Sequence, residues 1–236
     1  MRDPYLYDDI DVLINLGEIK DQKMLRRAEA DITSISMIAV YNIKFDEFNI
    51  DTLKEINFLI FGQLYEWAGE FRLIQMTKSE DILGDDTVRY SFPKEIKKEL
   101  LIIMKEIKKL KRTDENDIDI VFRLVRIISK IWQIHPFREG NTRTVMVFSI
   151  LLAEKLGFDV NHELFCKHAK YVRNSLVWAS QGMYSKYEYI ERIFYDALLG
   201  NIENIELSNK SEDAYKKIGA YDVNNYVEKN HEYKEK

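Results

Sequence analysis

The chain has 236 residues, of which 46% are hydrophobic and 32% charged, and its formal net charge is −5. Its 9 Gly and 3 Pro amount to about 5% of the residues, against roughly 12% in an average protein. So few backbone breakers disfavour a many-turned β-sandwich, a collagenous chain and a disordered one, and the acidic charge argues against a direct nucleic-acid role.

The N-terminal part of the chain is predicted to be helical after an irregular start. The first twenty residues are rich in Asp and Tyr and predict an irregular lead-in. Apolar residues at helical spacing predict a helix over residues 21–41. A second helix follows, with Asp51 as its N-cap, and Gly69 lies beyond its end.

Residues 70–92 differ from the segments around them. Their ends are β-prone, their middle is polar, and Leu-Gly-Asp-Asp at 83–86 favours a turn. Pro93 closes the segment. We therefore predict a short hairpin or flap, although the spacing fits a simple connection equally well.

A basic amphipathic helix is predicted to begin at Pro93, which suits a first helical turn, and to run to about residue 112. Its lysines face away from its Ile and Leu residues. Such a face can meet anionic partners, but we favour an ordinary solvated surface.

Two strongly apolar helices are predicted next. Over residues 117–134 the polar side chains form one narrow stripe, at spacings of four and three, so this helix should be buried on most sides. Residues 144–156 are apolar nearly all round, and Gly157 is placed to end that helix.

The remaining sequence predicts further helices over these ranges: 161–181, 185–199 and, as short pieces, 208–217 and 221–230. From Gly200 onwards the sequence is charged and weakly apolar. We expect one domain over residues 1–199 and a charged, helical appendage over 200–236. The fold class is all-α, a helical bundle with a short β-hairpin.

A polar stretch, HPFREGNTR at 135–143, separates the two apolar helices. Pro136 disfavours helical geometry at His135, so the first helix should end there. Gly140 lets successive backbone amides converge on an anion. Asn141 or Thr142 can cap the following helix, whose N-terminus attracts anions.

The charged side chains of this stretch suit phosphoryl or nucleotidyl transfer. Arg143 supplies a fixed positive charge, and Glu139 supplies a hard oxygen of the kind that Mg²⁺ prefers. His135 can be neutral near pH 7 and accept a proton from a hydroxyl. On spacing alone, a structural helix cap and a surface ion pair fit the same residues, because short motifs give many false positives.

HPFREGNTR closely resembles the signature of the Fic/Doc family, HxFx(D/E)GNxR. The lead-in at 3–33 and the segment QLYEWAGEFRLIQMTKSE at 63–80 also resemble Fic proteins, so the resemblance covers about residues 3–199. It implies a Fic fold and an Mg²⁺-dependent protein adenylyltransferase. Such an enzyme transfers AMP from ATP to a Ser, Thr or Tyr hydroxyl of a target protein and releases pyrophosphate.

The resemblance also implies a role for each motif residue. His135 would be the general base for the target hydroxyl, and Glu139 would hold the Mg²⁺ that bridges the phosphates. The nucleotide would lie on the loop and the helix that follows it, through these residues: Phe137 (which anchors the loop in the core), Gly140, Asn141, Thr142 and Arg143. A target segment would add as a strand to the flap at 70–92.

Two positions depart from the family pattern. Thr142 stands where a Gly is usual, and Met146 replaces the second Arg of a longer RxxR motif. Met146 can neither bind distal phosphates nor pair with an inhibitory glutamate. A Fic-like transferase that uses another nucleotide or phosphodiester donor, and a non-catalytic nucleotide- or partner-binding module, therefore stay open as alternatives.

The family's inhibitory pattern, (S/T)xxxE(G/N), has no complete match in the sequence. The nearest segments are 208–213 and 224–229, and ordinary charged helices are favoured for both. The lead-in resembles that of Fic toxins held by a separate antitoxin, so a small antitoxin with an inhibitory helix is an expected partner.

The remaining features bear on location and metal. The acidic start has no apolar signal region, and Cys166 is the single cysteine, which together favour a reducing cytoplasm. The longest near-apolar stretch, 145–153, is too short to span a bilayer. Cys166 lies near His162 and His168, but a zinc site is not expected without further ligands.

Overall fold

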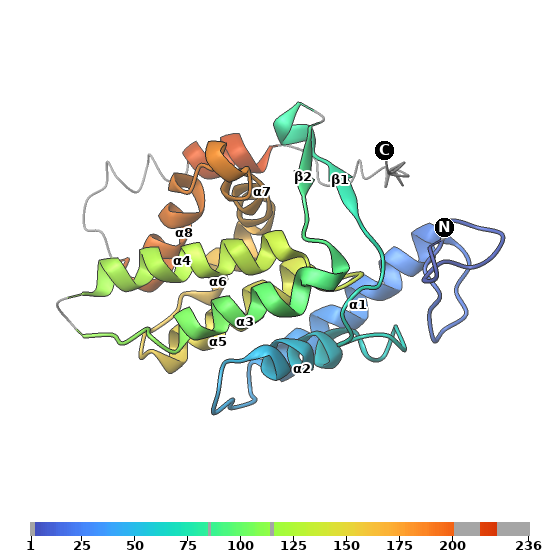
Figure 1. Cartoon of the computed structure of the whole chain (residues 1–236), viewed down its shortest axis with the longest axis horizontal. Helices are drawn as coiled ribbons and strands as arrows, with labels where there is room; N and C mark the ends of the chain where they lie inside the picture. The colour runs from blue at the N-terminus through green and yellow to red at the C-terminus, as the bar shows by residue number, and fades with distance from the viewer. Residues whose placement is uncertain (1–2, 85, 114–115, 201–212, 221–236) are drawn as a thin grey trace.

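The computed structural model describes residues 3–84, 86–113, 116–200 and 213–220. Figure 1 shows a bundle of helices with a small hairpin standing over one end of it. The helices are α1 Gln22–Val40, α2 Ile50–Phe61, α3 Ile96–Ile107, α4 Asp117–Ile134, α5 Asn141–Lys155, α6 His162–Lys167, α7 Ala169–Ala179 and α8 Glu188–Leu198, and the strands are β1 Thr77–Ser79 and β2 Thr87–Arg89. The predicted all-α fold with a β-hairpin is confirmed.

Helix α4 is the centre of the bundle and contacts α3, α5, α7 and α8. Its buried face includes Leu124, Ile128 and Ile131, all without solvent exposure. Each such side chain contributes about 1.5–3 kcal/mol by leaving water. The helix spans the predicted 117–134 because its apolar spacing and the following Pro136 agree on where it ends.

Local capping explains where the first two helices begin. Asp21 is the N-cap of α1, since its carboxylate accepts from the Met24 amide at 2.7 Å. The cap of α2 is Asn49, which accepts from the Thr52 amide at 3.0 Å, so the prediction of Asp51 as cap is wrong by two residues. Asp51 instead lies in the first turn, where its charge favours the helix dipole.

Two helix ends also differ from prediction. Helix α3 stops at Ile107 rather than near 112, because Leu110 turns into the core and Arg112 pairs with Asp117 at 2.7 Å. The helix predicted over 161–181 is divided into α6 and α7 at His168, where the backbone leaves helical geometry and the ring packs on Tyr215.

The hairpin lies in the middle of the 70–92 segment. Its two strands are antiparallel, with Lys78 opposite Val88, and a 3₁₀ turn at Asp81–Leu83 ends at Gly84. Gly84 has φ +65°, a conformation that glycine adopts without a Cβ penalty. The predicted hairpin is confirmed, with strands of three residues each.

The lead-in is irregular, as predicted, yet held in place. Leu6 and Leu13 form an isolated antiparallel bridge, and Tyr5 and Val12, which precede them, are buried. At the other end of the chain, residues 213–219 are helical. The carbonyl of Ile218 there accepts from the Asn174 side chain of α7 at 2.9 Å.

The division at residue 199 stays a prediction. The segments 208–213 and 224–229, which come nearest to the inhibitory pattern, fall outside the described residues apart from Asp213. In the part of the chain that the structure describes, no helix has the length and hydropathy needed to cross a membrane.

Candidate active site

His135 ends α4 in a strained, left-handed conformation with φ +53°. Such a backbone costs a non-glycine residue of order 1–3 kcal/mol and is typical of functional positions. The side chain of Arg72, itself 1% exposed, donates from Nε to the His135 carbonyl at 2.7 Å and from Nη2 to the Ile134 carbonyl at 3.3 Å. Arg72 therefore satisfies the last carbonyls of α4 and holds the turn.

The imidazole of His135 lies between two aromatic rings. The Tyr90 ring stacks on it at 3.9 Å between centroids, and the Trp132 ring meets it edge-on at 5.6 Å. Burial lowers the pKa of His135 well below its ordinary value, and the charges of Lys78 and Arg72 lower it further. The ring is therefore neutral near pH 7 and able to accept a proton.

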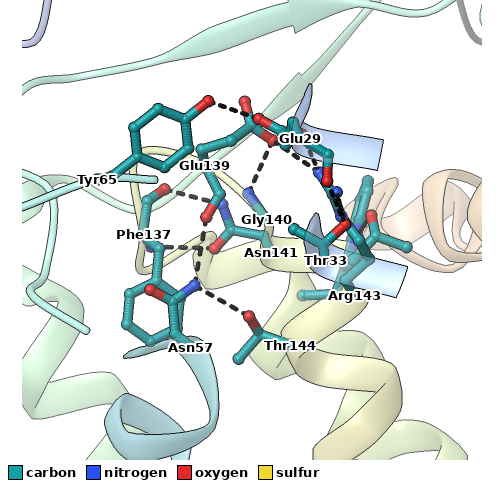
Figure 2. Close-up of polar contacts among 12 residues, drawn as sticks. Glu29, Thr33, Asn57, Tyr65, Phe137, Glu139, Gly140, Asn141, Arg143 and Thr144 are labelled. Atoms are coloured by element: carbon teal, nitrogen blue, oxygen red, sulfur yellow. Dashed lines mark hydrogen bonds and ion pairs between the residues drawn. The ribbon is translucent and has the colours of Figure 1, made fainter. Parts of the chain in front are cut away.

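Asn141 holds the loop between α4 and α5 closed. Its side chain accepts from the Phe137 amide at 3.0 Å and donates to the Phe137 carbonyl at 2.8 Å, as Figure 2 shows. Phe137 is fully buried against Phe71. From α2, the buried Asn57 donates to the Glu139 carbonyl at 3.3 Å, so a second helix supports the loop.

Gly140, and not Asn141 or Thr142 as predicted, is the N-cap of α5. Asn141 cannot cap because its side chain is engaged with Phe137, and the Thr142 hydroxyl accepts from the Trp132 indole at 2.9 Å. Gly140 has φ +78°, and a Cβ there would lie 2.0 Å from the Phe61 ring. Only glycine fits, and the first amides of α5 keep no intrahelical acceptor.

Arg143 points from α5 to α1, where it interacts with Glu29 and Thr33 (Figure 2). Its guanidinium bonds to the Glu29 carboxylate and to the Thr33 hydroxyl, the latter at 2.9 Å. The other Glu29 oxygen accepts from the Tyr65 hydroxyl at 2.6 Å. Burial and the nearby charge of Glu139 raise the pKa of Glu29, although Arg143 acts in the opposite direction.

Glu139 lies in the same cluster, with Oε1 3.8 Å from the Arg143 guanidinium and 2.7 Å from the Gly140 amide. Burial opposes its ionisation, but the charges of Lys78 and Arg143 outweigh burial and hold the pKa of Glu139 below its ordinary value. Glu139 is therefore an ionised carboxylate at the start of α5, with oxygen atoms suited to a hard cation.

Arg138 points to the other side of the loop and is buried with Asp3 of the lead-in. Nε and Nη2 of Arg138 bond to the same Asp3 oxygen at 3.1 and 2.8 Å, and both side chains are at most 3% exposed. A buried charge needs such a partner, because its transfer from water is costly. The lead-in therefore supplies, through Asp3, the carboxylate that pairs with Arg138 of the loop.

A cavity of about 470 Å³ lies over these residues. Six of the seven predicted site residues line it, namely His135, Glu139, Gly140, Asn141, Thr142 and Arg143. Phe137 lies in the core beneath, which fits the packing role that was expected of it. The size suits a nucleotide-sized ligand, since ligand pockets commonly measure about 300–1,000 Å³.

The cavity is also lined by residues that were not predicted to belong to the site, among them Glu29, Lys78, Tyr90, Trp132 and Arg173. They come from α1, the hairpin, α4 and α7, far from one another in sequence. Their place in the cavity depends on contacts between distant segments, which the local sequence pattern does not reveal.

A family profile described as the Fic/DOC family matches residues 47–153, which include the hairpin, α4, the loop and nearly all of α5. Residues 47–153 form a Fic/DOC family domain. The matched region contains the complete HPFREGNTR loop, and the lead-in and α1 precede it.

Among curated relatives of this chain is "Protein adenylyltransferase VbhT" of Bartonella schoenbuchensis, 31% identical over 161 residues. The match covers 68% of this chain but only 32% of VbhT. Another relative, "Probable protein adenylyltransferase Fic" of Escherichia coli K12, is 26% identical over 174 residues, and the match covers 71% of this chain and 80% of that protein.

Solved Fic domains share the fold. The BepC protein of Bartonella tribocorum superposes with a TM-score of 0.69 at 22% identity, and the match covers 82% of this chain and 95% of that one. The BepA effector, a type IV secretion system protein, gives 0.68 at 20% identity and covers 91% of this chain and 73% of that one.

Proposed function

We propose that this chain is a protein adenylyltransferase that transfers AMP from ATP to a hydroxyl of a target protein. The observation that carries the proposal is the convergence, on one cavity, of a neutral His135, an ionised Glu139 and the open N-terminus of α5. Relatives named protein adenylyltransferase, and a BepC structure described with bound AMPPNP, support the choice of activity and donor.

In this reaction the hydroxyl oxygen attacks the α-phosphorus, and the bond from that phosphorus to the oxygen of the β-phosphate breaks. His135 accepts the hydroxyl proton, and pyrophosphate leaves with the bonding electrons. The α5 amides and Arg143 lie where they can stabilise the negative charge of the phosphates. Arg143 must share its guanidinium with Glu29 while it does so.

Glu139 is the residue that would hold Mg²⁺. A bound Mg²⁺ would neutralise phosphate charge and act as a Lewis acid. The fit is good because Glu139 is ionised and Mg²⁺ takes most of its ligands from phosphates and water.

The test is incubation of the protein with α-labelled ATP, Mg²⁺ and a bacterial lysate, followed by mass spectrometry of labelled proteins. We expect label on protein hydroxyls that is lost in His135→Ala and on removal of Mg²⁺ with EDTA. Labelling that persists unchanged in His135→Ala would refute the role of that base. Wild-type protein that binds ATP but transfers nothing would indicate a nucleotide-binding module instead.

Met146 favours one alternative, a transferase with a different donor. Its side chain is uncharged, 9% exposed and belongs to the core packing of α5. Met146 is not among the described residues that line the cavity. A panel of labelled nucleotides and phosphodiesters, compared by transfer to the same target, distinguishes this alternative from ATP-dependent transfer.

The target segment is proposed to bind at the hairpin. Among the described residues, the sheet of β1 and β2 contains no third strand, so it ends at an outer edge on each side. An extended peptide can add to a sheet edge. A proline scan of an identified target peptide should abolish modification where the peptide amides bond to the edge.

A small antitoxin and a cytoplasmic location complete the proposal. Helix α1 exposes Met24, Ile35 and Ile38, with 63, 72 and 67% of their surface accessible, and exposed apolar residues of this size favour a protein partner. Co-expression with a neighbouring small reading frame that carries (S/T)xxxE(G/N), followed by purification, tests for a stable complex. Because Met146 replaces the second arginine of the RxxR motif, Arg143 is the motif arginine that would pair with the antitoxin's glutamate.

A further inference from the structure

Most of the positive charge around the cavity is already paired. Five cations line it, Arg26, Lys78, Arg138, Arg143 and Arg173. Three of these are arginines with buried or half-buried carboxylate partners: Arg138 with Asp3, Arg143 with Glu29 and Arg173 with Glu80. Because these pairs join different parts of the chain, they fix the walls of the cavity as well as its charge.

Of these five cations, Lys78 is the one that the hairpin contributes. It is directly opposite Val88, and cross-strand neighbours project to the same face of a sheet. Val88 is fully buried, and Tyr90, two residues further along, stacks on His135. Residues two apart on a strand share a face, so Lys78 lies on the inner face of the hairpin, towards His135.

The strand segment that carries Lys78 is anchored by Glu80, two residues further along the chain. Two oxygens of Glu80, which is 3% exposed, bind the guanidinium of Arg173 on α7, one of them at 2.6 Å. Such a bidentate pair has a defined orientation. It joins the end of β1 to α7, and Tyr90, just beyond β2, stacks on His135, so the backbone that carries Lys78 is held on both strands.

Lys78 lines the same cavity as His135 and Glu139. Its charge is the foremost electrostatic influence on both His135 and Glu139, and it lowers the pKa of each. In the proposed reaction the transferred phosphoryl group would be bound in this cavity, beside His135 and Glu139.

We propose that Lys78 contacts the transferred phosphate of the nucleotide and stabilises the negative charge that develops on it during transfer. The inference rests on the proposed transfer reaction for its catalytic part. It assigns to the hairpin a residue of the anion site, in addition to any role that the strands have in holding a target. Glu80 and Arg173 are then positioning residues for Lys78.

The first test measures binding rather than turnover. AMP and adenosine, each with Mg²⁺, are titrated into wild type, Lys78→Gln, Lys78→Met and Lys78→Arg. We expect both neutral variants to lose about tenfold or more in AMP affinity, the effect of one charged hydrogen bond, with adenosine affinity unchanged. Lys78→Arg should retain most of the AMP affinity. Equal AMP affinity in wild type and the neutral variants overturns the proposal.

The matched control is Arg89→Gln, because Arg89 is an exposed cation on β2 that does not line the cavity. It should bind AMP as the wild type does. A similar loss in Arg89→Gln would mean that the general charge of the hairpin, and not a contact of Lys78, determines affinity. Two neutral variants of different shape keep the test readable if one of them fails to fold.

The second test measures transfer. With a saturating target, Lys78→Gln should reduce the rate constant by about a hundredfold, as removal of a single charge-stabilising donor does in other enzymes. A rise in KM for the target alone, with AMP affinity intact, would overturn the proposal in favour of a target contact. If wild type itself transfers nothing, the proposed function fails, whereas the contrast between AMP and adenosine still decides whether Lys78 binds the phosphate.

Discussion

The ring of Tyr90 lies 3.9 Å from that of His135, at an interplanar angle of 17°, and excludes water from one face of the imidazole. Burial is the main reason why the pKa of His135 is lowered. The base is therefore neutral, and competent to accept a proton, well into the acidic range. Transfer activity should fall only at a pH below the ordinary pKa of histidine.

Replacement of Tyr90 by Ala should move that acidic limit upwards. Water then reaches the ring, the protonated form becomes less unfavourable, and the pKa of His135 rises towards its ordinary value. NMR titration of the imidazole C–H signals and the pH profile of kcat/KM should shift together. Tyr90→Phe preserves the stacked ring and serves as the control. An unchanged pKa in Tyr90→Ala would show that other groups, such as Lys78 and Arg72, dominate.

Glu29→Gln is expected to stabilise the protein at neutral pH. The pKa of Glu29 is raised in the folded state, so its contribution to stability is present below the unfolded pKa and lost as pH rises through the folded pKa. Gln mimics the protonated form at every pH. Urea denaturation should therefore show a more stable variant at pH 7 and a difference that closes as pH falls through the folded pKa.

Glu55→Gln is the control for this measurement, because Glu55 is an exposed residue on α2. Its difference from wild type should be small at all pH values. A Glu29→Gln variant less stable than wild type at pH 7 would mean that the ion pair with Arg143 outweighs both burial and the repulsion from Glu139.

The buried pair of Glu80 and Arg173 should respond very differently to single and double substitution. Arg173→Met leaves the Glu80 carboxylate buried without its partner, which costs about 3–5 kcal/mol. Arg173→Met with Glu80→Leu removes both charges and should recover most of that loss. Denaturation midpoints measure both steps, and a double variant as unstable as the single one would show that shape, not charge, is what matters there.

Gly140→Ala should lower stability for two reasons, backbone strain and a steric clash. Gly84→Ala measures the backbone strain alone. At Gly84, which has φ +65° and open space around a Cβ, Ala costs only the strain of the left-handed backbone, about 1 kcal/mol. At Gly140 the Cβ would also meet the Phe61 ring at 2.0 Å, so the loss of stability should be at least twice as large. Adding Phe61→Leu should relieve part of it. Equal losses at the two glycines would contradict the steric argument.

Much of the fold could be predicted because its signals are local. The bounds of α4 follow from apolar spacing and one proline, and the hairpin follows from a polar turn between β-prone segments. Helix caps were less predictable because several neighbouring residues can cap. Asn141 was expected to cap α5, but it hydrogen-bonds Phe137, and only the approach of Phe61 shows why Gly140 takes that place.

The motif residues of the site could be found from the sequence, whereas their partners could not. Glu29 and Asp3 look like ordinary surface acids in the sequence, and α1 even buries Thr33 and Ser36 while it exposes Ile35. Their positions depend on contacts between distant segments. Lys78 is a similar case, since its inward direction follows from the pairing register with Val88.

The ion pairs of Arg138 with Asp3 and of Arg143 with Glu29 also bear on the order of folding. They join residues 135 and 114 positions apart in the chain. Contacts of such separation carry a large loop-closure entropy and form late. The motif loop can therefore reach its final charge balance only after the first thirty residues have docked on the folded bundle. An incompletely folded or N-terminally clipped chain would keep the motif and lack a finished anion site.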